Sequence, residues 1–394
     1  MSIQNKLDPT NEQDWAGLAG HWLLRPDTIY LNHGSFGLCP TEVRSERRKW
    51  IRALDEQPMD FYLRQMEPAL IEARTELGKF IGTDRKNLIF VDNATYAMNV
   101  VAKSLPLQEN DEVLISDLEY GAVDRIWDRV RDDKGITIVR PQISIPIQSN
   151  QQIVEEILAA VTEKTKLAVI SHVTSATALI LPVREICLRL RERGVPVCID
   201  GPHAPAQVDL DIESLGCDFY CASCHKWLCA PLGTGFLYVH PEMQSYVVPP
   251  VLSWGRLKPF VPESWDEEFT WLGTRDPSGF LSIPKAIGFM NGIGLDSFRN
   301  RSRYLARWIE ERLVSQFGTQ TIAGRDYGFY GSMAHVPLPS GNWDHLQRQL
   351  WEEVGIEVMV NSHQNRPFIR VSCHLYNNTA QLDTLAKALD RLTS

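Results

Sequence analysis

Residues 167–200 read LAVISHVTSATALILPVREICLRLRERGVPVCID, and both ends of this stretch are short apolar runs. Such runs, at 167–170 and 195–199, are typical of strands that are buried on both faces. Between them, residues 184–193 repeat apolar side chains at helical spacing, which predicts a helix with one buried face. A strand, a helix and a second strand in this order predict two parallel strands joined by a crossover helix.

The same rhythm extends toward both ends of the chain. Further apolar runs predict strands at 88–91, 113–115, 136–139, 218–222 and 235–239. Helical patterns lie at 40–57, 65–80, 94–104, 122–130 and 152–161. Alternating strands and helices favour a mostly parallel sheet of the seven-stranded type, covered by helices on both faces. We therefore predict a large domain of the α/β class.

The pattern changes after about residue 284. Helices are predicted at 285–292, 297–316 and 382–392, and strands at 327–336, 356–360 and 368–371. This mixture predicts a smaller C-terminal α+β domain. We expect an N-terminal arm at 1–28, the large domain at 29–284, and the small domain at 285–394 together with part of the N-terminal segment.

The composition of the chain argues against several classes of function. The chain has 394 residues, with 40 Lys and Arg against 49 Asp and Glu, which gives a formal net charge of −9. This balance argues against a general affinity for nucleic acid or an anionic membrane. Residues 1–8 lack the apolar segment of a signal peptide, and no apolar run approaches the roughly 18 residues that span a bilayer. Eight cysteines are too few for a disulfide scaffold. We expect a cytoplasmic protein.

Polar residues follow each predicted strand, at the edge where open α/β sheets bind ligands. The segments are 92–95, 117–120, 171–175, 200–203 and 223–226. Together they bring hydroxyl groups, an aromatic ring, a carboxylate, histidines and a lysine to one edge. This combination suits an anionic aromatic cofactor better than a metal ion or a hydride carrier, and we expect no metal site.

Two of these segments allow a structural interpretation as well as a binding one. Asn93, Ala94 and Thr95 open a predicted helix, whose free N–H groups and dipole could seat a phosphate. Asp92 or Asn93 could equally serve as a helix cap. Tyr120 could stack on a planar ring, or pack as an ordinary half-buried tyrosine. The residues alone leave both alternatives open.

Asp200 and Lys226 carry the strongest chemical signal because both come shortly after apolar strands. A partly buried carboxylate needs a cation, and a protonated pyridine nitrogen would provide one; the alternative is a cap for the next helix. A partly desolvated lysine has a lowered pKa and can form a Schiff base. Most lone lysines are solvated surface charges, but the position of Lys226 after a strand favours the reactive role.

The cysteines at 217–229 allow two metal-based alternatives. Cys221-Ala222-Ser223-Cys224-His225 matches the C-x-x-C-H pattern of haem attachment. Cys217, Cys221, Cys224 and Cys229 also look like a zinc cluster, although no second Cys-x-x-Cys pair completes a structural site. We expect mostly buried apolar thiols instead.

A family likeness runs through these motifs. Asp200-Gly201-Pro202-His203, followed by Ser223-Cys224-His225-Lys226-Trp227, resembles the class V aminotransferase family of fold-type I pyridoxal-phosphate enzymes. The opening motif YLNHGSFG at 30–37 and the run CHKWLCAP at 224–231 look most like isopenicillin N epimerases and their relatives. The likeness spans roughly residues 28–380. It implies a fold-type I architecture with pyridoxal 5'-phosphate as cofactor.

The resemblance also implies roles for individual residues. We expect Lys226 to form the Schiff base, Asp200 to pair with the pyridine nitrogen, and Tyr120 to stack on the ring. These three residues are the predicted catalytic residues. Arg370 would hold the substrate α-carboxylate, a task that suits its bidentate guanidinium. Further cofactor contacts would come from Asn93, Ala94, Thr95, Ser175, His203, Ser223 and His225. Further substrate contacts would come from Asn32, His33, Gly34 and Ser35.

The resemblance extends to assembly. Gly273 and Thr274 resemble a segment that reaches the phosphate bound by the neighbouring subunit, which implies a homodimer with shared active sites. His203 occupies the position where related desulfurases carry a glutamine near the cofactor's phenolic oxygen.

One difference from the family pattern argues against one reaction, the removal of sulfur from cysteine through an enzyme persulfide. Members that abstract sulfur through a persulfide carry a cysteine on a loop of the C-terminal domain, but the matching residues 361–366, NSHQNR, contain none. Cys373 comes later and is expected to be structural. We predict an isopenicillin N epimerase-like isomerase acting at the α-carbon of an amino acid or peptide-like amine. The alternatives are a C–S lyase that cleaves a cysteine derivative or sulfoxide by β-elimination, and a non-catalytic binding protein on the same scaffold.

Overall fold

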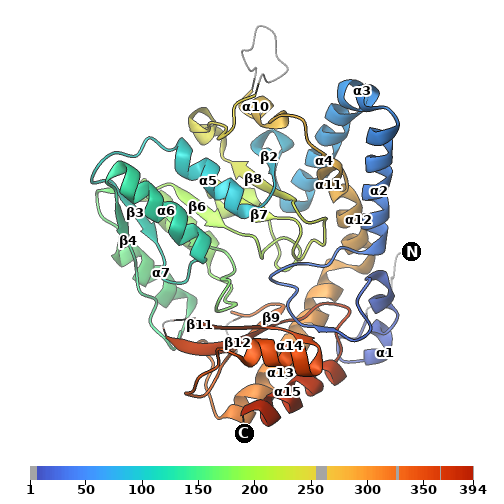
Figure 1. Cartoon of the computed structure of the whole chain (residues 1–394). Coiled ribbons are helices and arrows are strands. Elements are labelled where there is room, and N and C mark those ends of the chain that lie inside the picture. Colours follow the sequence, from blue (N-terminus) through green and yellow to red (C-terminus); the bar gives the residue numbers. More distant parts are fainter. Residues whose placement is uncertain (1–6, 254–263, 325–327, 364, 394) are drawn as a thin grey trace.

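The computed structural model describes residues 7–253, 264–324, 328–363 and 365–393. Its centre is a seven-stranded sheet (Figure 1) with the strand order β2-β8-β7-β6-β5-β3-β4. All neighbouring pairs are parallel except those made by β8, which runs antiparallel to β2 and β7. The strands are β2 (Leu88–Val91), β3 (Glu112–Ile115), β4 (Thr137–Val139), β5 (Thr165–Ser171), β6 (Val197–Asp200), β7 (Phe219–Ser223) and β8 (Gly235–Val239). The predicted α/β class is confirmed.

Both faces of this sheet are buried, as the continuous apolar runs predict. On β5, Leu167 and Val169 join one hydrophobic cluster, whereas Ala168 and Ile170 join another, because successive side chains point to opposite faces. The first cluster is covered by α5 (Ala94–Ser104) and α6 (Gly121–Lys134). The second is covered by α4 (Met66–Ile81), α7 (Asn150–Ala159), α8 (Val183–Arg191) and α12 (Ile283–Ile293).

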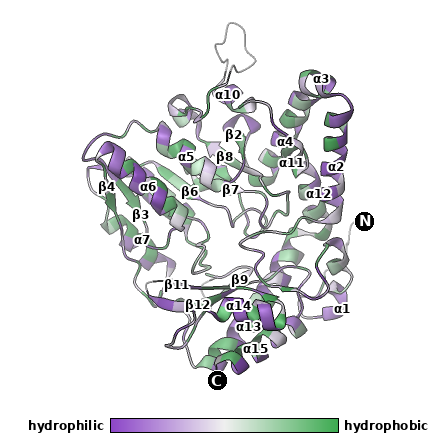
Figure 2. Ribbon diagram, viewed as in Figure 1, coloured by the Kyte–Doolittle hydropathy of each residue, from purple (hydrophilic) through white to green (hydrophobic). Residues whose placement is uncertain are grey.

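Helices of the first hundred residues pack against later ones. Helix α2 (Thr41–Glu56) begins after Pro40 and contacts α12, which also contacts α4. In Figure 1 these helices stand together on one side of the sheet. Helix α4 ends at Gly82, whose φ of 72° is the left-handed conformation that favours glycine. Figure 2 shows mixed hydrophilic and hydrophobic residues along α2 and α6, as expected for helices with one face in solvent.

The C-terminal part builds a separate antiparallel sheet with the order β11-β12-β9. Its strands are β9 (Met333–Pro337), β11 (Met359–His363) and β12 (Arg366–Ser372). The long helix α13 (Leu295–Phe317) contacts β9 and α15 (Thr379–Thr393). The hydrophobic cluster of this part includes Leu31, and β1 (Ile29–Tyr30) pairs in parallel with β10 (Ile356–Glu357). Residues near 30 are therefore held against the C-terminal part.

Differences from the predicted elements lie mostly at their ends. Helix α6 extends four residues past the predicted end at Val130, to Lys134, and stops at Gly135 in the left-handed conformation. The predicted strand at 356–360 is divided into β10 and β11, which belong to different sheets. The predicted strand at 327–336 begins at Met333 in the described residues, and residues 325–327 lie outside them. Within the described chain, no helix combines the length and apolar character needed to cross a membrane.

Candidate active site

A cavity of about 460 Å³ opens where the carboxyl ends of the parallel strands face the C-terminal part. Most of the predicted site residues line it: Gly34, Ser35, Asn93, Ala94, Thr95, Tyr120, Ser175, Asp200, His203, Ser223, His225, Lys226 and Arg370. A larger hollow of about 820 Å³ lies beside α14 (Leu346–Val354) and β11. It has no lysine, cysteine or histidine among its described lining residues, so the smaller cavity is the better reaction site.

Lys226 lies on the loop that follows β7 and reaches the cavity with its ε-amine. Its Nζ lies 2.9 Å from Nε2 of His203. Burial lowers the pKa of Lys226, the charge of Arg370 lowers it further, and Asp200 acts in the opposite direction. A lysine with a lowered pKa has a larger fraction of its amine uncharged at neutral pH, which is the form that attacks a carbonyl carbon.

Asp200 ends β6 and is 4% exposed. Burial raises the pKa of its carboxyl group, whereas the charge of Lys226 lowers it. Within the described residues, no side chain or backbone group is recorded as donating a hydrogen bond to this carboxylate. A buried carboxylate without a donor is costly, and a protonated ring nitrogen in the cavity would supply both the proton and the charge.

The first turn of α5 forms the opposite wall of the cavity. Asn93 caps the helix by accepting a hydrogen bond from the N–H of Tyr96, and Ser223 Oγ accepts one from the N–H of Ala94 at 3.2 Å. Gly235 leaves room for this turn, because a Cβ at residue 235 would lie 3.0 Å from Cα of Asn93. The capping role of Asn93 is thus present, and it leaves Thr95 and the positive end of the helix dipole facing the cavity.

Arg370 reaches the cavity from β12 and is 1% exposed. Its guanidinium donates to the backbone oxygen of Ser175 at 2.6 Å and to Ser35 Oγ at 2.8 Å, with a longer bond of 3.3 Å to Asn32 Oδ1. All these partners are uncharged, and its Nε has no hydrogen-bond partner among the residues that the structure describes. Burial lowers the pKa of Arg370 to about 10. A buried guanidinium without a counter-ion is a ready binding site for a carboxylate.

The segment 32–37 joins Arg370 to the lysine loop. A Cβ at Gly34 would lie 2.9 Å from Met333 Sδ and from Ser372 Oγ, and one at Gly37 would lie 2.3 Å from the backbone oxygen of His225. At Gly37 only glycine permits such a close approach of two backbones, and at Gly34 a side chain would collide with those of Met333 and Ser372. Asn32 does not line the cavity, but it holds Ser35 and Arg370 by hydrogen bonds.

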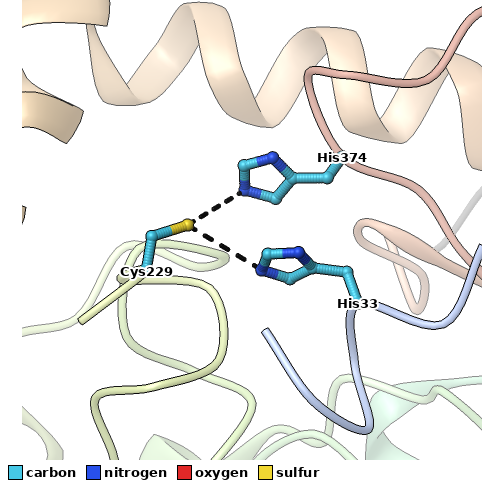
Figure 3. Close-up of side chains that lie close together, drawn as sticks. All are labelled: His33, Cys229 and His374. Atoms are coloured by element: carbon cyan, nitrogen blue, oxygen red, sulfur yellow. Dashed lines mark hydrogen bonds between the residues drawn. The ribbon is translucent and has the colours of Figure 1, made fainter. Parts of the chain in front are cut away.

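His33 also lies behind the cavity rather than in its wall. It belongs to a buried group with Cys229 and His374, shown in Figure 3. Since the backbone oxygen of Lys226 can only accept, His33 Nε2 must donate to it, at 3.0 Å, and Nδ1 accepts from Tyr376 Oη at 2.8 Å. Burial lowers the pKa of His33 to about 3. The neutral imidazole therefore positions the backbone of Lys226.

The geometry of this group argues against a metal ion. The proton on His33 Nε2 occupies the position that an ion would need, and the two imidazole rings stack with centroids 4.0 Å apart and planes 21° apart. An ion must lie near the plane of each ligating ring, which two stacked rings do not allow. Within the described residues, Cys217, Cys221 and Cys224 do not belong to any group of ligand atoms close enough to hold one ion, so the zinc alternative loses support as well.

Tyr120 and Glu119 follow β3 and face different surroundings. Tyr120 precedes α6, lines the cavity and is 49% exposed. Glu119 accepts hydrogen bonds from Ser116 Oγ at 2.8 Å and from Ser171 Oγ at 2.6 Å. Burial raises the pKa of Glu119 to about 8. The sequence places Glu119 directly after a strand, but nothing in its local pattern shows that two serines from neighbouring strands would enclose it.

Gly273 and Thr274 do not line the cavity of their own chain. Gly273 has a φ of 107°, which L-residues with side chains rarely adopt, and Thr274 is exposed. Their predicted role at the phosphate of a partner subunit stays a prediction.

A lysine, a buried carboxylate, a helix N-terminus and a buried guanidinium around one cavity of a doubly covered sheet define a fold-type I pyridoxal-phosphate enzyme. Comparison with known proteins gives the family. The family described as aminotransferase class V matches residues 60–385. The isopenicillin N epimerase of Amycolatopsis lactamdurans is 36% identical over 96% of this chain and 98% of its own length. The chain belongs to the class V aminotransferase family, as its motifs predict.

A further curated relative and a solved structure are also similar to this chain. A putative L-cysteine desulfhydrase of Oryza sativa subsp. japonica is 28% identical over 92% of this chain and 83% of its own length. The cystine C–S lyase C-DES, solved with its product cysteine persulfide, superimposes with a TM-score of 0.81 at 20% identity, covering 93% of this chain and 98% of the lyase. The fold is shared across these proteins.

Proposed function

We propose that this protein is a pyridoxal-phosphate-dependent isomerase that inverts the α-carbon of an amino acid or peptide-like amine. The observation that carries the proposal is the uncompensated Arg370 guanidinium in the same cavity as Lys226 and Asp200. The identity to isopenicillin N epimerases at nearly full length supports the choice of reaction. Measurement of α-proton exchange with solvent tests the proposal.

The residues present fit the cofactor. Ser223, His225 and the Ala94-Thr95 turn would hold its phosphate, and Asp200 would hold its ring nitrogen. When bound, pyridoxal phosphate supplies an electron sink for negative charge at the α-carbon. Arg370 would orient the substrate by its carboxylate, and Lys226 Nζ would accept the α-proton. Return of the proton to the other face completes the inversion.

A second function, C–S cleavage of a cysteine derivative, has support from the desulfhydrase relatives. It would use the same Lys226 and Arg370 and would differ in the fate of the substrate side chain. A route through a persulfide on one of the enzyme's own cysteines has no support. Every cysteine except Cys39 is buried, and none lines the cavity in the described residues. Phe36, Val123, Ile126 and Met359 give the cavity an apolar side, which favours a substrate larger than cysteine.

We propose Tyr120 as the second proton donor. It lines the cavity from a different element than Lys226, and its hydroxyl has no hydrogen-bond partner recorded within the described residues. Tyr120→Phe should leave proton exchange through Lys226 intact but slow the interconversion of the two enantiomers by on the order of 10²-fold. Chiral chromatography and proton NMR in deuterated water measure the two rates in the same sample.

Tyr246 provides the matched control, since it is 47% exposed and lies outside the cavity. Tyr246→Phe should change neither rate. Equal slowing of exchange and interconversion in Tyr120→Phe would show that Tyr120 only packs against the cofactor.

The protein is proposed to act as a homodimer in which Gly273 and Thr274 contact the phosphate of the partner subunit. Mixing Lys226→Ala with Thr274→Glu, each inactive alone, should restore roughly a quarter of wild-type activity. Half of the dimers would be hybrids, and each hybrid would hold one intact site. Lys226→Ala mixed with Asp200→Asn leaves no intact site and should show no more activity than the Asp200→Asn protein alone. Absence of recovery after demonstrated subunit exchange would refute the shared site. The cytoplasmic location remains a prediction from the sequence.

A further inference from the structure

We propose that Trp227 is a positioning residue that fixes the ring proton of His203 on Nε2, so that this N–H holds the Lys226 amine as an uncharged hydrogen-bond acceptor. The inference deepens the proposed function, since it rests on Lys226 being the reactive amine of that site. It concerns where a proton lies and is therefore measurable without any turnover.

Three side chains form a short chain of hydrogen bonds. Trp227 Nε1 donates to His203 Nδ1 at 3.3 Å, and His203 Nε2 lies 2.9 Å from Lys226 Nζ. Trp227 is fully buried, and His203 is 1% exposed. The backbone of His203 is held as well, because Gln207 Nε2 donates to its oxygen at 2.6 Å. The imidazole ring thus has a fixed place and one partner on each nitrogen.

The tautomer follows from the chemistry of indole. An indole N–H can only donate, so His203 Nδ1 must present a lone pair. A cationic imidazole would place two N–H groups against each other, and an imidazolate is not accessible at neutral pH. His203 is therefore neutral with its proton on Nε2. Burial lowers the pKa of His203 far below its ordinary value, and the charges of Lys226 and Arg370 lower it further.

The consequence for the lysine is direct. A protonated Nε2 donates, so the Lys226 nitrogen must accept, and only an uncharged amine has a lone pair to do so. An ammonium group at the same place would face an N–H. Without the Trp227 donor, the proton could move to His203 Nδ1, and Nε2 could then accept from a Lys226 ammonium. Trp227 thereby favours the nucleophilic form of the Lys226 amine through two successive hydrogen bonds.

Other charged groups around the pair set the background for any pH measurement. Asp200 and Arg370 act on Lys226, and Arg370, His33 and His225 act on His203. None of these side chains is recorded as hydrogen-bonded to either ring nitrogen of His203 in the described part of the chain. Trp227→Phe leaves each of these groups in place, and its phenyl ring keeps an aromatic neighbour for His33, whose ring centroid lies 5.1 Å from that of Trp227. A difference between the wild type and the variant therefore reports mainly the loss of the indole N–H.

The test uses Trp227→Phe, which keeps a large ring and removes the N–H. Trp22→Phe is the matched control, because Trp22 is also buried and donates its indole N–H to a backbone oxygen, that of Leu38, at 3.1 Å. Nitrogen-15 NMR of histidine-labelled full-length protein, with and without pyridoxal phosphate, reports the proton position. The His203 signals are assigned by their loss in His203→Gln.

In the wild type and in Trp22→Phe, His203 should carry its proton on Nε2, whereas Trp227→Phe should show protonated Nδ1. The rate of Lys226 acylation by acetic anhydride in the cofactor-free protein, followed by mass spectrometry, gives a second readout. In Trp227→Phe, the loss of one hydrogen bond that favours the uncharged amine should raise the pKa of Lys226. Labelling of Lys226 at pH 7 should then slow by about tenfold. A double variant tests the route: in the His203→Gln background, Trp227→Phe should have no further effect.

Two results would overturn the proposal. Protonated Nδ1 in the wild type would do so even if Trp227→Phe failed to fold. Unchanged tautomer and labelling in a folded Trp227→Phe protein would show that Trp227 only packs. Neither result bears on whether the enzyme is an isomerase, because both are read without substrate.

Discussion

Replacing Lys226 with alanine should abolish turnover, with a loss of about 10⁴-fold or more, and should remove the covalent attachment of the cofactor. The reason is that Lys226 Nζ would have two tasks in the proposed reaction: its uncharged amine would attach the cofactor, and the same nitrogen would accept the α-proton. Steady-state kinetics measures the first loss. Borohydride reduction followed by peptide mass spectrometry measures the second, since the wild type should carry a pyridoxyl group on Lys226.

Lys79→Ala is the control, because Lys79 is a surface residue on α4 that pairs with Glu76. It should behave as the wild type in both assays. If Lys226→Ala protein still gave a reducible attachment at a lysine with the wild-type visible spectrum, the assignment of the reactive lysine would be wrong. Stoichiometric bound iron or zinc in the purified protein would instead revive the alternatives based on Cys221 and Cys224.

Asp200→Asn should lower kcat by on the order of 10²-fold while leaving the fold intact. The carboxylate is buried and receives no recorded hydrogen bond from the described residues, so its charge would be available to keep a ring nitrogen protonated in the cavity. Asparagine has nearly the same shape and no charge. Stabilisation of negative charge that develops at the α-carbon would therefore be lost, and KM should change less than kcat.

Two comparisons sharpen this prediction. Asp200→Glu keeps the charge and should retain more activity than Asp200→Asn. Asp209→Asn removes a fully exposed carboxylate that lies 3.5 Å from the guanidinium of Arg299. This variant should have the kcat and KM of the wild type. Near wild-type turnover in Asp200→Asn would show that Asp200 is a structural cap.

The sequence predicts those parts of the fold and site that depend on local patterns. The apolar runs at 88–91 and 235–239 become β2 and β8 with the same bounds, because strands buried on both faces need continuous apolar residues. Asp200 and Lys226 meet because the carboxyl ends of neighbouring parallel strands share an edge. The cofactor follows from these residues and the family motifs.

Other features depend on contacts between distant segments and leave no local signal. The Arg370 guanidinium is held by Asn32, Ser35 and Ser175, which come from two other regions of the chain. Trp227 enters the sequence analysis only as the last residue of a family motif, and its hydrogen bond to His203 appears only in three dimensions. The division of 356–360 between two sheets likewise reflects pairing with β1 and β12 rather than a change in composition.

The central claim is that the enzyme removes and returns an α-proton without cleaving the substrate. The most direct test is incubation of the pure wild-type protein with a panel of amino acids and peptide-like amines in deuterated water. Proton NMR, chiral analysis and assays for pyruvate, ammonia and sulfide are read on the same samples. We expect at least one substrate to gain deuterium at the α-carbon and appear in both configurations, with no pyruvate, ammonia or sulfide. Release of pyruvate and sulfide from a cysteine derivative, without inversion of any substrate, would contradict the claim and identify a lyase.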